Sequence, residues 1–265
     1  MKMGTTHKTQ ELNIPPLTFG INQIFEAPFD SGWLTFPRHY LLYASAGTFH
    51  LEVDQVRWLL PPQRAAWVAA QVPFRLTAAR RVTCNSVLFS HRLSLQPDFT
   101  CRVFAVSSLA REMLLYSMRW GTERQEEDKP ADSFFLALAH IGLELAAKPD
   151  EFWLPQAQSA ELSQALDYTL THLAAKPTFT EVAGAAAISE RTLARRFAEE
   201  TGLSWSQFVR RARMIRAMEL LAEPDIKIID VVYAVGFSSV SAFNHTFRTF
   251  TGETPSGYRQ RVQPL

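Results

Sequence analysis

The stretch SERTLARRFAEETG, residues 189–202, is repeated in pattern fifty positions later by SVSAFNHTFRTFTG, residues 239–252. Each copy opens on a serine, carries two apolar side chains one helical turn apart, and closes on Thr-Gly. A serine ahead of an apolar helical pattern is an N-cap signal, and a glycine after it ends a helix. The chain therefore contains an internal duplication of one helical unit.

A short apolar helix is predicted before each copy, over 180–187 and 228–235, with a tight turn near Ala187-Ile188 or Gly236-Phe237. Two helices joined by such a turn form a helix-turn-helix signature. Between the two units, a capping box at Ser204–Gln207 opens a helix that runs to about Ala222. At 1.5 Å per residue this helix is roughly 27 Å long, enough to hold the two units well apart.

Every segment after Ser159 reads as helix, which predicts an all-α C-terminal domain with six N-caps: Ser159, Thr180, Ser189, Ser204, Ser239 and Thr254, the last followed by Pro255.

The second helix of each unit is predicted to present a polar face. Leu193 and Phe197 in the first unit, and Phe243, Phe247 and Phe250 in the second, are expected to face the core. The outward positions are then Arg191, Ala194, Arg195 and Ala198 in the first unit, and Ser241, Asn244, His245 and Arg248 in the second. An arginine fork can pair bidentately with guanine, and small alanines allow close approach to a groove.

The basic residues are concentrated in this half. The net charge of the chain is only +1, yet residues 190–216 hold seven arginines against three glutamates, a local net charge of +4. This basic strip favours a nucleic-acid partner.

The C-terminal half resembles the DNA-binding domain of AraC/XylS family transcription regulators. The residues that carry the resemblance are Thr192–Phe197, Thr201-Gly202, Arg213, Ala217, Val235–Ser238, Phe243, Phe247, Thr251-Gly252, Thr254-Pro255 and Tyr258-Arg259. The resemblance implies base-facing positions at Arg191, Ala194, Arg195, Val240, Ser241, Asn244 and His245, and phosphate contacts at Arg196, Arg213 and Arg248. The alternative for these residues is a solvated helix face, and for Arg213 a structural role in the long helix.

The second recognition helix departs from the arginine or glutamine common at such places. Val240 and His245 are less able to form bidentate base contacts, so phosphate binding is expected to weigh more there.

The N-terminal half alternates in short apolar runs. Strands are predicted over 40–44, 48–53, 56–60, 65–68, 74–78 and 82–89, a spacing typical of a small all-β barrel or sandwich. This half resembles the cupin-like sensor domain of the same family. The resemblance covers residues 60–75 and extends through Cys101–Val103 into residues 109–120. The implied fold class is α+β, a cupin-like β-barrel with connector helices followed by the double helix-turn-helix domain.

The predicted domains are 1–106 (sensor), 107–155 (helical connector) and 156–265 (DNA binding). Helices are expected over 108–120 and 133–147, with a polar loop at 121–130 between them. Leu109, Met113, Leu114 and Met118 form an apolar stripe that either pairs two subunits or packs against its own barrel.

Three functions are weighed for the barrel. As the resemblance implies, it binds a small-molecule effector or mediates homodimer formation; alternatively it is a protein-interaction platform without a ligand, which a closed, side-chain-filled barrel would favour. The third is a cupin enzyme, which needs a metal held by converging ligands. His39, His50 and His91 occur singly, with no His-x-His, so we expect no metal, cofactor or catalytic site. Trp33, Trp58 and Trp67 either line a pocket or pack in the core.

The partners that follow are double-stranded operator DNA, RNA polymerase and a small-molecule effector, and no membrane. Residues 1–18 lack a signal-peptide pattern and no apolar run approaches ~18 residues, so a cytoplasmic protein is expected. Cys84 and Cys101 are expected to be free, buried thiols.

Overall fold

A computed structural model describes residues 17–125 and 128–263, and it divides the chain into two units. The first comprises residues 1–54 and 58–150, and the second residues 55–57 and 151–265. Two segments lie outside the described residues near earlier expectations: residues 1–16, for which no signal peptide was expected, and residues 126–127 of the polar loop.

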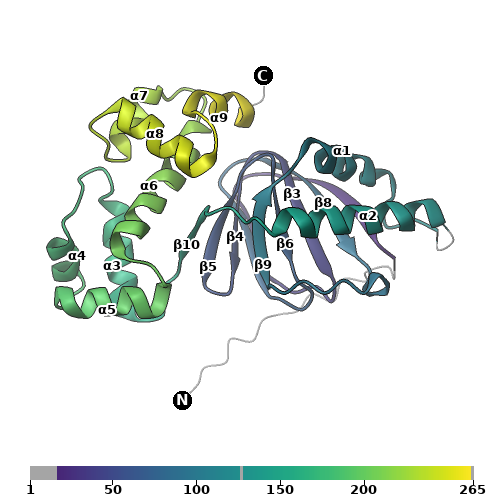
Figure 1. The fold of residues 1–265 in the computed structure, drawn as a ribbon, viewed down its shortest axis with the longest axis horizontal. Coiled ribbons are helices and arrows are strands. Elements are labelled where there is room, and N and C mark those ends of the chain that lie inside the picture. Colours follow the sequence, from purple (N-terminus) through teal and green to yellow (C-terminus); the bar gives the residue numbers. More distant parts are fainter. Residues whose placement is uncertain (1–16, 126–127, 264–265) are drawn as a thin grey trace, which may run out of the picture. The chain divides into compact units, whose positions relative to one another are not determined.

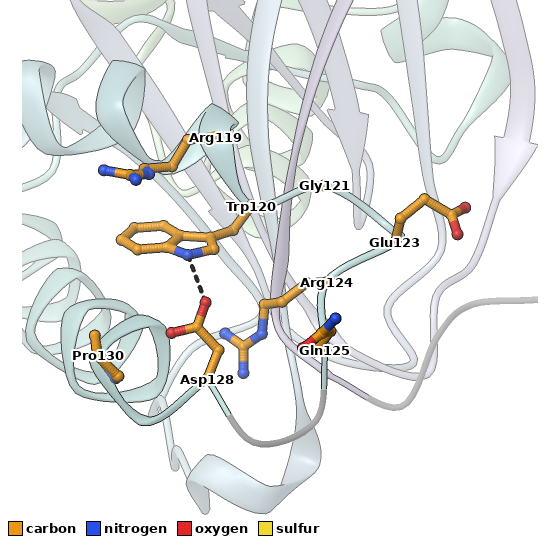
Figure 2. Close-up of a pocket in the computed structure, with 8 residues that line it drawn as sticks. All are labelled: Arg119, Trp120, Gly121, Glu123, Arg124, Gln125, Asp128 and Pro130. Atoms are coloured by element: carbon orange, nitrogen blue, oxygen red, sulfur yellow. Dashed lines mark hydrogen bonds between the residues drawn. The ribbon is translucent and has the colours of Figure 1, made fainter.

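The first unit is built from β-strands (Figure 1). They are β1 (Phe19–Phe25), β2 (Phe29–Leu34), β3 (His39–Ala46), β4 (Phe49–Val53), β5 (Val56–Leu60), β6 (Arg64–Val68), β7 (Phe74–Ala78), β8 (Val82–Phe89) and β9 (Cys101–Ala105); β10 (Trp153–Pro155) follows later. All six expected strands are present. The expectation missed β1, β2, β9 and β10. In β1 and β2, exposed polar residues weaken the apolar alternation that marks a strand.

The strands of the described residues form two antiparallel sheets rather than one closed barrel. One has the order β1-β8-β3-β6-β9 and the other β10-β5-β4-β7-β2. The sandwich alternative therefore describes this unit better than a closed barrel.

Strand β8 lies between β1 and β3 and packs on both faces. Val87 and Phe89 join an outer core with Trp67, which stacks on Phe89 at 5.0 Å between ring centroids. Successive side chains alternate between faces, so Cys84, Ser86 and Leu88 point the other way, into the space between the sheets.

Helices α1 (Ser108–Tyr116) and α2 (Lys129–Ala146) cover the outer face of the first sheet (Figure 1). The N-cap of α1 is Ser107, and a 3₁₀ turn (Ser117–Arg119) follows α1 where one continuous helix was expected. Helix α2 begins four residues earlier than expected because Asp128 caps it and Pro130 occupies its first turn. In the apolar stripe expected over 108–120, Leu114 is buried and Met113 and Met118 pack on the same core, whereas Leu109 is 62% exposed.

The second unit is all helical apart from β10 and its short share of β5. Its helices are α3 (Ala160–Thr171), α4 (Phe179–Ala185), α5 (Glu190–Thr201), α6 (Trp205–Leu221), α7 (Ile228–Ala234), α8 (Val240–Thr251) and α9 (Pro255–Val262). Figure 1 shows α6 running from the group of α3, α4 and α5 to the group of α7, α8 and α9. Among the helices that the structure describes, none combines the length and apolarity that a membrane span requires.

Five of the six expected caps are observed, at Ser159, Ser189, Ser204, Ser239 and Thr254. The sixth prediction is wrong, because Thr178 caps α4 in place of Thr180. Thr178 and Glu181 form a capping box, in which the threonine hydroxyl accepts from the Glu181 N–H and the carboxylate accepts from the Thr178 N–H. The glutamate three residues on decides which threonine is the cap.

Candidate nucleic-acid interface and a cavity in the sheet unit

The first helix-turn-helix unit consists of α4 and α5, joined by residues 186–189. Ala187 in this turn has a φ of 54°, in the left-handed region. Helix α5 buries Leu193 and Phe197 against Val182 of α4 and Phe208 of α6. The hydroxyl of Thr180 donates to Glu190 at 2.6 Å, which adds a direct link between the two helices.

The second unit, α7 and α8, repeats this arrangement. Gly236 occupies the turn with a φ of 80°, and Phe243 and Phe247 of α8 are fully buried. The Phe247 ring lies 5.6 Å from those of Phe243 and Tyr258. Phe250, expected in the core, is only partly buried and packs at 5.4 Å on Phe152, ahead of β10.

The two copies also end in the same way. Gly202 and Gly252 take left-handed conformations after α5 and α8, with φ of 68° and 83°. The hydroxyl of Thr201 donates to the Phe197 carbonyl at 2.6 Å, and that of Thr251 to the Phe247 carbonyl at 2.8 Å. The Thr-Gly repeat seen in the sequence therefore ends α5 and α8 in the same way.

Every residue expected to face bases is exposed. On α5 these are Arg191, Ala194 and Arg195, and on α8 they are Val240, Ser241, Asn244 and His245. The Arg195 side chain is 60% exposed and pairs with Glu199 one turn later, at 2.7 Å. An exposed i,i+4 pair is weak, so it holds the guanidinium loosely and leaves it able to change partner.

The three arginines expected at phosphates lie in different surroundings. Arg248 is exposed on α8. Arg196 is 25% exposed and makes a two-pronged ion pair with Glu161 of α3, with Nη1 and Nη2 at 3.0 and 3.2 Å from the carboxylate oxygens. The Arg213 guanidinium lies against the Gly236 turn, and burial lowers its pKa. The structural alternative therefore fits Arg213, and it extends to Arg196.

The basic strip is partly neutralised by carboxylates. Glu151, which precedes β10, lies 3.3 Å from Arg211 and 3.9 Å from Arg210. Arg216 pairs with Glu219 at 2.9 Å. Sequence reasoning missed Glu151 and Glu161 because they lie outside the counted stretch and meet the arginines only in the folded chain.

A cavity of about 440 Å³ lies between the two sheets, and sequence reasoning did not identify the residues that line it. Tyr40, Cys84 and Ser86 line it on one side, and several phenylalanines on the other. The alternation of Cys84, Ser86 and Leu88 along β8 is the sequence signal that could have identified one side of it. Trp67 and Trp58 are buried in packing instead.

The histidines of the metal-site alternative do not converge. The imidazole of His39 is held between backbone groups, with Nδ1 3.1 Å from the Ala70 N–H and Nε2 3.1 Å from the Leu95 carbonyl. Within residues 17–125 and 128–263, no group of three metal-ligating side chains is found. Cys84 is buried and Cys101 partly buried, both as free thiols.

Comparisons with known proteins agree with this geometry. A helix-turn-helix domain family matches residues 182–261. The HTH-type transcriptional regulator NimR of Escherichia coli (strain K12) is 28% identical over 239 residues, which cover 86% of this chain and 84% of NimR. The Msm operon regulatory protein of Streptococcus mutans serotype c is 25% identical over 240 residues, 88% of this chain and 81% of that protein.

Among solved structures, wild-type ToxT from Vibrio cholerae strain SCE256, bound to an unsaturated fatty acid, matches with a TM-score of 0.40 at 11% identity. The match covers 94% of this chain and 96% of ToxT. The duplicated helix-turn-helix geometry, the family match over it and two regulators that align over most of their length agree with one another. The chain has a C-terminal domain of the helix-turn-helix family and is a DNA-binding transcription regulator.

Proposed function

We propose that the protein recognises a specific operator by placing α5 and α8 in successive major grooves, with Arg195 as the principal base-reading residue. The observation that carries the proposal is the exposed face of α5, where Arg191, Ala194 and Arg195 lie opposite the buried Leu193 and Phe197. A recognition helix must combine a buried face that fixes it with an exposed face that reaches base edges.

The second helix is proposed to contribute less to sequence specificity. Ser241, Asn244 and His245 can each make single base contacts, and Asn244 can pair bidentately with adenine. Val240 offers only apolar contact. Arg248, exposed on the same helix, is proposed as a phosphate contact, whereas Arg196 and Arg213 are proposed as structural residues.

The test is a binding titration of the full chain against DNA from its own upstream intergenic region, across a salt series, compared with random DNA. Arg195→Ala should lose about 1–3 kcal/mol of operator binding and relax the preference at one base position. Arg111→Ala removes an exposed arginine on α1 and serves as the charge-matched control. Wild-type protein that shows no preference for any genomic fragment over random DNA would overturn the proposal.

We also propose that a small molecule held in the sandwich cavity governs operator occupancy. The cavity of 440 Å³ has the size of a small-molecule site, and it favours a sensor over a protein-interaction platform with a filled core. A ligand shifts the equilibrium only if it prefers one conformational or dimeric state. Homodimer formation and contact with RNA polymerase stay predictions from the sequence. Leu109 of α1 is exposed and could take part in a dimer contact.

No catalytic role is part of the proposal. The relatives that align over most of the chain carry the names of regulators, which supports a binding function for the sheet unit.

A further inference from the structure

The cavity between the sheets has a polar floor made of neutral groups. The Ser86 hydroxyl lies 2.8 Å from the Tyr40 hydroxyl and 2.9 Å from the Cys84 sulfur. All three side chains are buried, and burial raises the pKa of the Cys84 thiol to about 12 and that of Tyr40 above its ordinary value. All three groups therefore stay protonated, and together they offer hydrogen-bond donors and acceptors without charge.

The opposite walls are aromatic. Phe36 packs edge-on against Tyr40 and Phe74, with ring centroids 5.4 Å apart in each pair, and Phe25 lies 4.3 Å from Phe29. Phe74 is buried, whereas Phe25, Phe29 and Phe36 keep part of their surface exposed. Covering these ring faces with an apolar ligand stabilises the complex in proportion to the area removed from water.

The charge around the cavity is unfavourable for an ionic ligand. Among the lining residues, all of which the structure describes, Asp30 is the charged one, and none is basic. Asp30 makes two hydrogen bonds with Arg75 and accepts a third from the Gly32 N–H, and these interactions lower its pKa to about 2. It therefore remains a carboxylate whose charge is largely balanced by Arg75, so it attracts a cation only weakly and gives an anion no favourable contact.

We propose that the sandwich cavity binds an uncharged, mainly aromatic small molecule that bears one hydroxyl or carbonyl group, which hydrogen-bonds to Ser86. This inference rests on the proposed function, because it names the class of effector for the site proposed there. Burying an ionised carboxylate here would be costly because no basic side chain lines the cavity, and burying an ammonium would be costly because the Asp30 carboxylate is already paired with Arg75.

The test uses three matched probes on the full chain: 2-naphthol, naphthalene and 2-naphthoate, measured by isothermal titration calorimetry and thermal unfolding. 2-Naphthol should bind saturably and raise the unfolding temperature. Naphthalene, which lacks the hydroxyl, should bind roughly three- to tenfold more weakly. 2-Naphthoate should show no saturable binding.

Variants locate the site. Ser86→Ala should bring the 2-naphthol affinity down to that of naphthalene, and Ile21→Trp, which fills the cavity, should abolish both. Thr83→Val changes the same strand on its other face and should bind like wild type. Thermal unfolding of each variant without probe shows that it is folded, and Leu76→Phe is the second cavity-filling variant should Ile21→Trp unfold.

The inference is overturned if no probe binds, if 2-naphthoate binds as well as 2-naphthol, or if Thr83→Val weakens 2-naphthol as much as Ser86→Ala does. Operator binding measured on the same preparations separates the two proposals. Intact operator preference without probe binding rejects the ligand class alone, whereas probe binding without operator preference rejects the DNA-reading proposal alone.

Discussion

At the scale of single residues, the turns of the two helix-turn-helix units both need a left-handed backbone conformation, but different residues adopt it. Ala187 and Gly236 both take positive φ, 54° and 80°. A Cβ on Gly236 would lie 2.5 Å from the Leu173 carbonyl oxygen and 3.2 Å from the Arg213 guanidinium. Only glycine fits that turn, because it must approach another segment's backbone as well as adopt a left-handed conformation.

We expect Gly236→Ala to lower the free energy of unfolding by at least about 1–2 kcal/mol, from backbone strain alone, with more from the clash. Operator binding should fall as well, because the turn sets the angle of α8. Chemical denaturation measures the first effect. An unchanged stability would show that Leu173 and Arg213 do not confine this turn.

Ala187→Gly is the matched substitution in the first unit. Ala187 is exposed, and its left-handed backbone is strained by roughly 1 kcal/mol, which glycine would relieve. Glycine also gives the unfolded chain more conformational freedom, which offsets this gain. The expected change in unfolding free energy is therefore close to zero. A loss as large as that of Gly236→Ala would contradict the distinction drawn between the two turns.

At the scale of elements, the pair of Arg196 and Glu161 ties α5 to α3. Both guanidinium nitrogens that could grip a phosphate are already bonded to the carboxylate. Since Arg196 shares its helix with Arg191 and Arg195, this pair fixes α5 to α3 while the other two arginines stay exposed.

We expect Arg196→Gln to lower the unfolding free energy by about 0.5–1 kcal/mol, a modest value because the pair is partly exposed. The slope of operator affinity against salt concentration should not change. A phosphate contact would instead reduce that slope by about one. Glu161→Gln is the control, and it should lower the unfolding free energy by a similar amount without changing operator affinity. Stronger operator binding by Glu161→Gln would show that the freed Arg196 contacts a phosphate.

The elements themselves were largely predictable. Caps and i,i+4 apolar pairs act within one or two turns, so Ser189, Ser204 and Ser239 and the buried faces of α5 and α8 could be read from the sequence. Strands β1 and β2 could not, because their exposed polar residues interrupt the local apolar alternation and only pairing with β8 and β7 makes them strands. The capping of α4 by Thr178 shows that even a local signal needs its full motif.

At the scale of the whole molecule, His39 connects distant segments of the sheet unit. Its Nδ1 accepts from the Ala70 N–H, so Nε2 carries the proton and donates to the Leu95 carbonyl. Burial lowers the pKa of His39 below its ordinary value. Protonation would place a second hydrogen opposite the Ala70 N–H and break that bond.

The protein should therefore lose stability as the pH falls. Because the folded pKa of His39 is lower than the unfolded one, the unfolded state binds more protons near and below pH ~6.5. This contribution is complete above the unfolded pKa and is lost as the pH falls through the folded pKa. Thermal unfolding between pH 7.5 and 5 should show the decline, and His39→Gln should flatten it.

His91→Gln, which replaces an exposed histidine, is the control and should keep the wild-type pH dependence. An identical decline in the His39 variant would assign the acid sensitivity to other groups.

The sequence alone determined the architecture of the helical half, its duplication, the long connecting helix and the exposed faces of α5 and α8. Each rests on local signals, which act over a few residues and survive without tertiary context. Tertiary structure alone decided which arginines are engaged, because Glu161 lies 35 residues from Arg196. It likewise decided the neutral cavity, because Tyr40 and Ser86 are 46 residues apart and meet only when β3 pairs with β8.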